Sequence, residues 1–175
     1  MTDHIWAKTI LTSYRYLERL ADAIDSMIEN RGLNSMFVSE SNYAYNNIYN
    51  LADKLIDLSE RKIKLINLKV LTEDCLKKCG NSFAKLLISK YIDGKKNLEI
   101  AKLHNLSLRT FFRRLSDAEK RFEEVLAMKG FDKNKLESYL NSEKWIIEIK
   151  ERLEFLHSGQ EFEVETRYLN KLAVS

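Results

Sequence analysis

The sequence predicts an all-α fold: an N-terminal helix, a long coiled-coil-like helix, a helix-turn-helix and a C-terminal helical extension. The chain of 175 residues contains no proline and only five glycines. Because proline breaks helix interiors and glycine marks helix ends, this composition favours long, uninterrupted helices. Helix-forming Leu, Lys, Glu and Ala dominate between the glycines, and the apolar residues recur in steps of three, four and seven.

Composition argues against several classes of protein. No apolar run reaches the roughly 18 residues of a transmembrane helix, and the N-terminus lacks the features of a secretory signal. We therefore expect a cytoplasmic protein. Cys75 and Cys79, four residues apart in a helical segment, fit a packing role better than a redox pair. The histidines lie far apart in the sequence, so we expect neither a metal site nor a cofactor.

The first helix is expected over residues 3–30 and should end at Gly32. Its apolar face is expected to carry Ile10, Tyr14, Leu17, Leu20, Ala21, Ile24, Met27 and Ile28. A linker follows, with a short apolar patch at residues 36–38. A second, long helix is then expected over residues 41–78.

This long helix carries two apolar stripes. The first stripe consists of Ile48, Leu51, Leu55, Leu58 and Leu65. The second stripe consists of Ile56, Ile63, Ile66 and Val70. One stripe would cover the first helix as an antiparallel pair, which leaves the other for the downstream domain or for a second copy of the protein. Because one partner cannot cover two faces, we expect oligomerisation; the alternative is that both stripes are buried within one subunit.

Shorter helices are expected after Gly80. Two of them cover residues 81–93 and 95–105, and an Asp93-Gly94 turn separates them. Their inward residues are expected to be Phe83, Leu86, Leu87, Tyr91, Leu98, Ala101 and Leu103. From Phe131 onward a further helical segment is expected to run until Gly159. Its apolar rows are Leu136, Tyr139, Leu140, Ile146, Ile149, Leu153 and Leu156.

Residues 95–128 make a helix-turn-helix candidate. A polar break, "NLS", follows the helix over 95–105, and Ser107 can cap a helix over 108–128 because its hydroxyl accepts an orphan backbone N–H. The buried face of this second helix is expected to be Phe111, Leu115, Ala118, Phe122 and Val125. Helical hairpins are common, so shape alone is weak support for DNA binding.

Charge strengthens this interpretation. Residues 95–121 contain eight basic and three acidic residues, a net charge of +5, whereas the whole chain carries +3. The rest of the chain therefore sums to −2, and the positive charge is concentrated where a phosphate backbone would be met.

The exposed face of the second helix suggests how DNA would be read. Arg109 and Arg113 can fork onto guanine edges or phosphates, and Phe112 can contact a thymine methyl. The start of the preceding helix would attract a phosphate. The predicted DNA-binding residues are Lys95, Lys96, Asn97, Lys102, Leu108, Arg109, Thr110, Phe112, Arg113, Arg114 and Lys120. The alternative is a solvated basic face, with Phe112 packed against a neighbouring helix.

The run "LLISKYIDGKKNLEIAKLHNLSLRTFFRRLSDAEKRFEEVL" resembles region four of bacterial sigma factors. The matching positions are Tyr91, Gly94, Glu99, Ile100, Ala101, Leu106, Ser107, Thr110, Phe111 and Leu115. The family has a glycine in the turn where this chain has Asn105, which can adopt the left-handed conformation. By this resemblance, Arg109, Phe112 and Arg113 fall where the family reads bases.

The order of segments is similar to that of the ArpU/RinA-like group, small phage and prophage transcription regulators of Gram-positive bacteria. Those proteins pair an N-terminal helix and a long helix with a sigma-like helix-turn-helix. The resemblance implies a helical oligomerisation segment over residues 1–79 and a DNA-binding domain over 80–128. The C-terminal helical extension, residues 129–175, lies outside it.

The leading hypothesis is a sequence-specific DNA-binding regulator of transcription that dimerises through its long helices. Its expected partners are double-stranded DNA and, as a further candidate, RNA polymerase, with no membrane contact. One alternative is a DNA-packaging subunit resembling a small terminase, which would form ring-sized oligomers. Another is a protein-interaction module whose basic helix contacts RNA polymerase. No enzyme is expected, because the sequence has no glycine-rich phosphate loop and no nucleophile with a plausible base, hence no catalytic residues.

Overall fold

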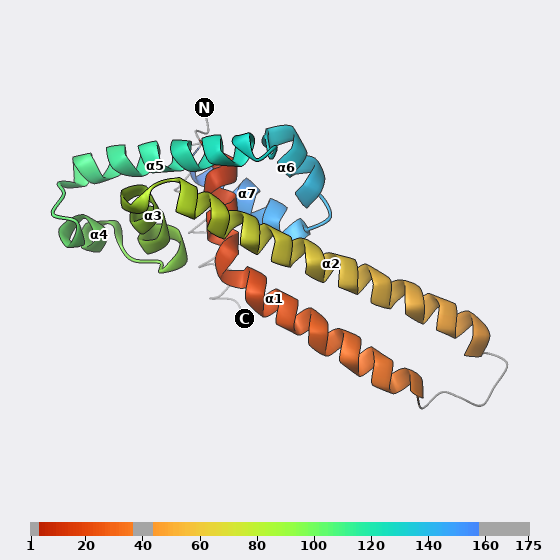
Figure 1. The fold of residues 1–175 in the computed structure, drawn as a ribbon. Helices are drawn as coiled ribbons and strands as arrows, with labels where there is room; N and C mark the ends of the chain where they lie inside the picture. The colour runs from red at the N-terminus through yellow and green to blue at the C-terminus, as the bar shows by residue number, and fades with distance from the viewer. Residues whose placement is uncertain (1–3, 37–43, 158–175) are drawn as a thin grey trace, which may run out of the picture. The chain divides into compact units, whose positions relative to one another are not determined.

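The computed structural model describes residues 4–36 and 44–157, and every regular element within these ranges is helical (Figure 1). The predicted all-α class is therefore confirmed. The elements are α1 (Ile5–Met36), α2 (Ala44–Lys78), α3 (Asn81–Leu87), a π-helical turn (Ile88–Ile92), α4 (Asn97–Leu103), α5 (Leu108–Met128), α6 (Lys133–Leu140) and α7 (Lys144–His157). None of the described helices combines the length and the apolar character needed to cross a membrane.

The chain divides into two compact units. Tyr14–Glu73 form one, which we call the hairpin unit, and the residues before and after it form the other, the globular unit. These boundaries differ from the expected divisions at residues 79 and 128, because the first residues of α1 and the C-terminal helices belong to the same unit as α3, α4 and α5.

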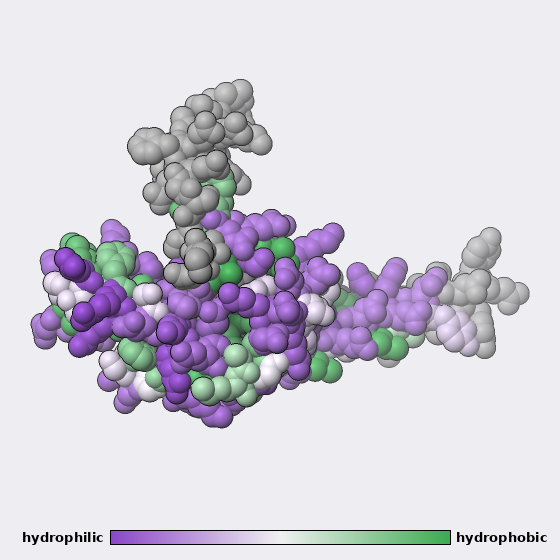
Figure 2. Space-filling model, turned by 90° about the horizontal axis from the view of Figure 1, so that it is seen from above, coloured by the Kyte–Doolittle hydropathy of each residue, from purple (hydrophilic) through white to green (hydrophobic). Residues whose placement is uncertain are grey.

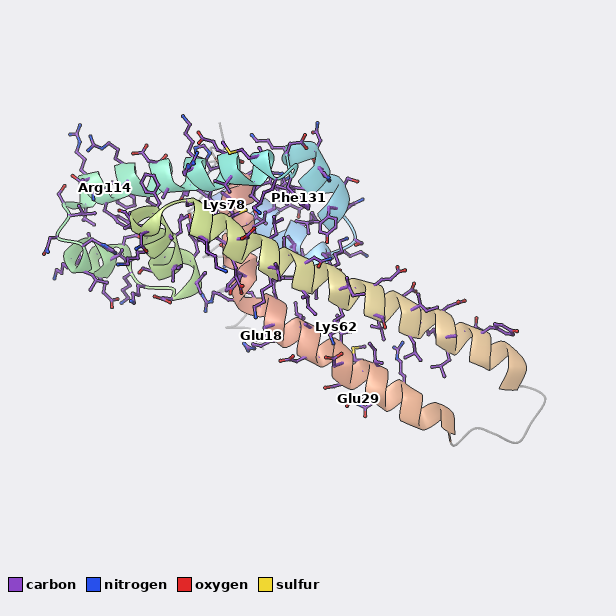
Figure 3. All side chains as sticks on the ribbon, in the orientation of Figure 1. Glu18, Glu29, Lys62, Lys78, Arg114 and Phe131 are labelled. Atoms are coloured by element: carbon purple, nitrogen blue, oxygen red, sulfur yellow. The ribbon has the colours of Figure 1, made fainter. Side chains whose placement is uncertain are left out.

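In the hairpin unit, α1 and α2 are antiparallel. Three contacts join them: Tyr14–Glu73 (2.8 Å), Glu18–Lys69 (3.2 Å) and Asp25–Lys62 (2.5 Å). Each step of four or seven residues forward along α1 is matched by an equal step backward along α2, so one register holds throughout. Figure 3 labels Glu18 and Lys62 on the two helices. Since these ion pairs are partly exposed, they fix the register more than they stabilise the pair.

The two apolar stripes of α2 differ in exposure. In the first stripe, Leu65 is buried and Leu51, Leu55 and Leu58 are half-buried, while the side chain of Ile48 lies outside the described residues. The four side chains of the second stripe are between 40 and 57% exposed. The alternative prediction, that both stripes are buried within one subunit, is therefore wrong.

The prediction that Gly32 ends the first helix is wrong, because α1 continues to Met36. A glycine ends a helix when it adopts a left-handed conformation, and among the described glycines only Gly80, Gly94 and Gly130 have a positive φ. Within a helix, glycine costs only about 1 kcal/mol relative to alanine, which a long helix tolerates. The side chains of the expected patch at 36–38 and the expected helix start at Ser41 lie outside the described residues.

The first turns of α1 belong to the core of the globular unit. Five apolar residues of this segment are buried: Ile5, Trp6, Ala7, Ile10 and Leu11. Its polar residues Thr9 and Ser13 are also buried, and their hydroxyls donate to the backbone carbonyls four residues earlier, at 2.8 and 2.7 Å. A helix that is buried on all sides is a core element, so this segment is not part of an exposed hairpin.

Helix α5 is the longest element that lies wholly in the globular unit, and α3 and α4 pack on it (Figure 1). The five residues predicted to face inward, Phe111, Leu115, Ala118, Phe122 and Val125, are all buried. In the preceding helix, Leu86 and Leu87 are buried and Phe83 and Tyr91 half-buried, as predicted.

In α4 the predicted register is wrong for two residues. Leu98 and Leu103 are 54 and 62% exposed, whereas Ile100 and Ala101 are buried. The helix has only seven residues and is in contact with α5 and the π-helical turn, so one short row of side chains is enough to anchor it.

The C-terminal segment, predicted to be helical, forms the two helices α6 and α7. Gly130 ends α5 in a left-handed conformation, and the Asp132 carboxylate accepts the Lys135 N–H at 2.8 Å to start α6. The chain then breaks at Glu143, a buried residue that accepts a hydrogen bond from the Trp145 indole at 2.9 Å. Gly159, the expected end of the segment, lies outside the described residues.

Most of the predicted apolar rows do face inward in these two helices. Leu136, Leu140 and Ile146 are buried, while Tyr139, Ile149 and Leu153 are half-buried and Leu156 is exposed.

Candidate nucleic-acid interface

The turn between α4 and α5 is fixed by its own backbone and side chains. At the end of α4, the Leu106 N–H donates to the Ala101 carbonyl at 2.8 Å and the Asn105 N–H donates to the Lys102 carbonyl at 3.1 Å. This bond pair is a Schellman motif, which requires a left-handed residue at the position of Asn105. Asn105 has φ 52°, so the expectation that it takes the left-handed conformation is confirmed.

The start of α5 is capped as predicted. Ser107 Oγ accepts the Thr110 N–H at 3.2 Å and lies 2.9 Å from the Thr110 hydroxyl. With the Schellman motif before it and the cap after it, the turn leaves little freedom in the angle between α4 and α5. The first turns of α5 are thereby held in one orientation on the globular unit.

One face of α5 is cationic and open to solvent. Arg109, Arg113 and Lys120 follow one another at helical spacing on the face opposite Phe111 and Leu115, and all three are exposed. Among the described residues, no carboxylate lies within ion-pair distance of these three or of the exposed Arg114. Their charge is available to an external anion.

Burial also removes an acid from this surface. Glu119, one of the three acidic residues in the basic segment, is only 4% exposed and points into the unit. The exposed side of α5 is therefore more positive than the sequence count indicates.

Three other predicted DNA-binding residues on α5 carry no charge: Phe112, Leu108 and Thr110. Phe112 is 51% exposed and packs edge-on against Phe111, with 5.3 Å between ring centroids. Leu108, at the first position of the helix, is also exposed, whereas Thr110 is half-buried and engaged in the cap. Figure 2 shows hydrophobic and strongly hydrophilic surface side by side at the end of the unit where α5 begins.

The predicted DNA-binding residues that precede α5 differ in how freely an external anion can reach them. Lys96 and Lys102 are exposed without an ion pair among the described residues. Lys95 lies 3.4 Å from Asp93, and Asn97 Oδ1 accepts a hydrogen bond from Lys90 at 2.6 Å. An external anion would have to compete with Asp93 for Lys95, whereas the bond from Lys90 engages only the acceptor oxygen of Asn97.

Buried polar contacts anchor α5 from its inner side. The Glu119 carboxylate accepts a hydrogen bond from the Tyr91 hydroxyl and lies 3.5 Å from Lys8 Nζ. One turn further, Glu123 contacts the His4 ring at 2.8 Å. Burial, and then the neighbouring Glu119, raise the pKa of Tyr91, so its hydroxyl remains a donor at neutral pH.

The sequence did not predict that His4 and Lys8 contact α5, because the start of the chain was assigned to an oligomerisation segment. A signal was present in "HIWAKTIL", where apolar residues occupy all sides of a helix except at isolated polar positions.

The two cysteines pack as expected. Both are buried and free. Burial raises the pKa of Cys75 to about 12 and that of Cys79 to about 11, so both thiols are protonated at neutral pH and poorly nucleophilic.

Comparison with known proteins assigns neither a family nor a function to the chain. No protein-family model, no curated protein and no solved structure matches the chain. Within residues 4–36 and 44–157, no cluster of His, Cys, Asp and Glu has the arrangement of a metal site.

Proposed function

We propose that the protein is a sequence-specific DNA-binding regulator of transcription, which inserts the first turns of α5 into the major groove. The observation that carries the proposal is a row of exposed cations with no ion pair to any described residue, on a helix whose orientation is fixed by the Ser107 cap and the Asn105 turn. Arg109, Phe112 and Arg113 read bases, and the lysines around α4 contact phosphates. The resemblance of residues 86–126 to sigma region four supports the same assignment.

The Arg113→Ala substitution is expected to reduce discrimination between a selected duplex and random DNA by about 5- to 150-fold, because a bidentate contact to one base contributes about 1–3 kcal/mol. The selected duplex is obtained from a random pool with the wild-type protein, and both affinities are measured at one stated salt concentration.

Lys95→Ala is the matched control, since it removes a cation that is assigned to a phosphate. This variant is expected to weaken binding to selected and random duplexes by the same factor. An Arg113→Ala protein with an unchanged specificity ratio contradicts the base-reading assignment.

We further propose that the protein acts as a dimer through the second stripe of α2. Its four large aliphatic side chains repeat at coiled-coil spacing and remain exposed in one chain, and a second copy offers the same surface. A dimer would present two recognition helices to two half-sites, which compensates for the few base contacts that one short helix makes.

The Ile63→Glu substitution is expected to convert the dimer into a monomer in light scattering, because it places a charge at the centre of the stripe. Asn50→Glu adds the same charge to an exposed position of α2 outside the stripe and should leave the dimer intact. A wild-type protein that is monomeric at high concentration excludes this role for the stripe, and a ring-sized oligomer favours the packaging function.

Contact with RNA polymerase is a second candidate function that one observation favours. Leu98 and Leu103 are exposed on α4 beside the basic helix, and apolar side chains are typical of protein interfaces. Salt separates the two functions, since binding through several phosphates falls steeply with salt whereas an apolar interface persists.

A further inference from the structure

A groove lies beside the cationic face of α5, within the globular unit. Its lining comes from the junction of α2 and α3 on one side and from α5 on the other: Cys79, Gly80, Asn81, Ser82, Phe83, Arg113, Arg114 and Asp117. Its volume is about 560 Å³. None of the residues from the α2–α3 junction was among the predicted DNA-binding residues.

The groove combines apolar lining with a net positive charge. Arg113 and Arg114 bring two guanidinium groups to it and Asp117 brings one carboxylate, which lies beyond ion-pair distance of both arginines. Asn81 and Ser82 add an amide and a hydroxyl, both on exposed residues. Figure 3 labels Arg114 on α5 and Lys78, another exposed cation, at the end of α2.

Arg113 joins this groove to the base-reading face. It lies one helical turn after Arg109 on the exposed row and also lines the groove, whereas Arg114 lines the groove but lies off that row. A duplex whose bases meet Arg109 and Arg113 therefore brings a sugar-phosphate strand next to the groove, since the strands border the major groove.

We infer that the groove between the α2–α3 junction and α5 binds a backbone phosphate of the DNA strand that flanks the bases read by α5. Arg114 supplies the charge, and the Asn81 amide and the Ser82 hydroxyl donate hydrogen bonds to the phosphate oxygens. The inference rests on the proposed function, and it extends the footprint beyond the helix-turn-helix to a segment that the resemblance does not include.

Ser82→Glu tests the groove with little cost to folding, because Ser82 is exposed at the second position of α3 and an acidic residue is favourable in the first turn of a helix. The new carboxylate repels a phosphate. Affinities for selected and random duplexes should both fall by about tenfold, because a charge-assisted contact contributes about 1.5–3 kcal/mol. The specificity ratio should not change.

Asn134→Glu is the matched control. Asn134 is exposed and occupies the equivalent second position of α6, so the variant adds the same charge to the same unit away from the groove lining. Its affinities should equal those of the wild type. A third variant, Arg114→Ala, should lower the slope of log affinity against log salt by about 0.9, as expected for one lost phosphate contact.

The outcomes separate the two proposals. If Arg113→Ala loses discrimination while Ser82→Glu binds both duplexes like the wild type, the groove does not hold a phosphate and the proposed function stands. If the wild type shows no salt-dependent binding to any duplex, both proposals fail. If Ser82→Glu binds DNA normally but loses a protein partner, or if free inorganic phosphate protects Arg114 from modification and duplex DNA does not, the groove serves another ligand and the inference is overturned.

Discussion

The Glu119→Ala substitution is expected to lower the free energy of unfolding of the globular unit by about 3–5 kcal/mol, the usual cost of breaking a buried polar pair from one side. Glu119 is almost fully buried, and its carboxyl group contacts the Tyr91 hydroxyl and Lys8 Nζ. Removing it leaves the Tyr91 hydroxyl without this acceptor and opens a cavity under α5.

The measurement is chemical denaturation followed by tryptophan fluorescence. Both tryptophans of the chain, Trp6 and Trp145, lie in the globular unit, so their emission reports this unit and not the hairpin unit. Circular dichroism of the same samples follows all helices together.

Glu124→Ala provides the control on the same helix. Glu124 is exposed and, within residues 4–36 and 44–157, pairs only with Arg121, at 3.2 Å and three residues away, so its loss should cost less than about 0.5 kcal/mol. Equal effects of the two substitutions would mean that Glu119 contributes no more than a surface charge.

Phe111→Ala is expected to lower the same free energy by about 3–5 kcal/mol, the cost of truncating a buried phenylalanine. Phe111 is 0% exposed and lies where α5 faces the rest of the unit. At temperatures where the variant is partly unfolded, DNA binding should fall for selected and random duplexes alike, because fewer molecules have a formed α5.

The same substitution at the neighbouring residue, Phe112, is the comparison for Phe111→Ala. Phe112→Ala removes the same atoms from a side chain that is 51% exposed, so it uncovers less apolar surface than Phe111→Ala does; the edge contact with Phe111 that it removes contributes about 0.5–1.5 kcal/mol. The variant should remain folded and lose affinity chiefly for the selected duplex. If Phe112→Ala instead unfolds the unit as much as Phe111→Ala, Phe112 is a core residue and its role in reading bases is excluded.

Much of this fold could be predicted from the sequence because helices follow local rules. The 3.6-residue periodicity placed the five buried residues of α5, and the side-chain chemistry of Ser107 and Asn105 placed the cap and the left-handed turn. The cationic face followed from the same periodicity, since residues on the side opposite a buried row are exposed. The sequence thereby determined the all-α class and the candidate recognition helix with its charge.

Only the tertiary structure decided which elements surround that helix. The same periodicity failed for α4, where a seven-residue helix needs only one buried row, and the expected stop at Gly32 failed because this glycine keeps a helical backbone within α1. The inward position of Glu119 depends on Tyr91 and Lys8, and the groove depends on the α2–α3 junction meeting α5. Those contacts join residues far apart in the chain, and local spacing does not encode them because their free energy comes from packing and paired burial between helices.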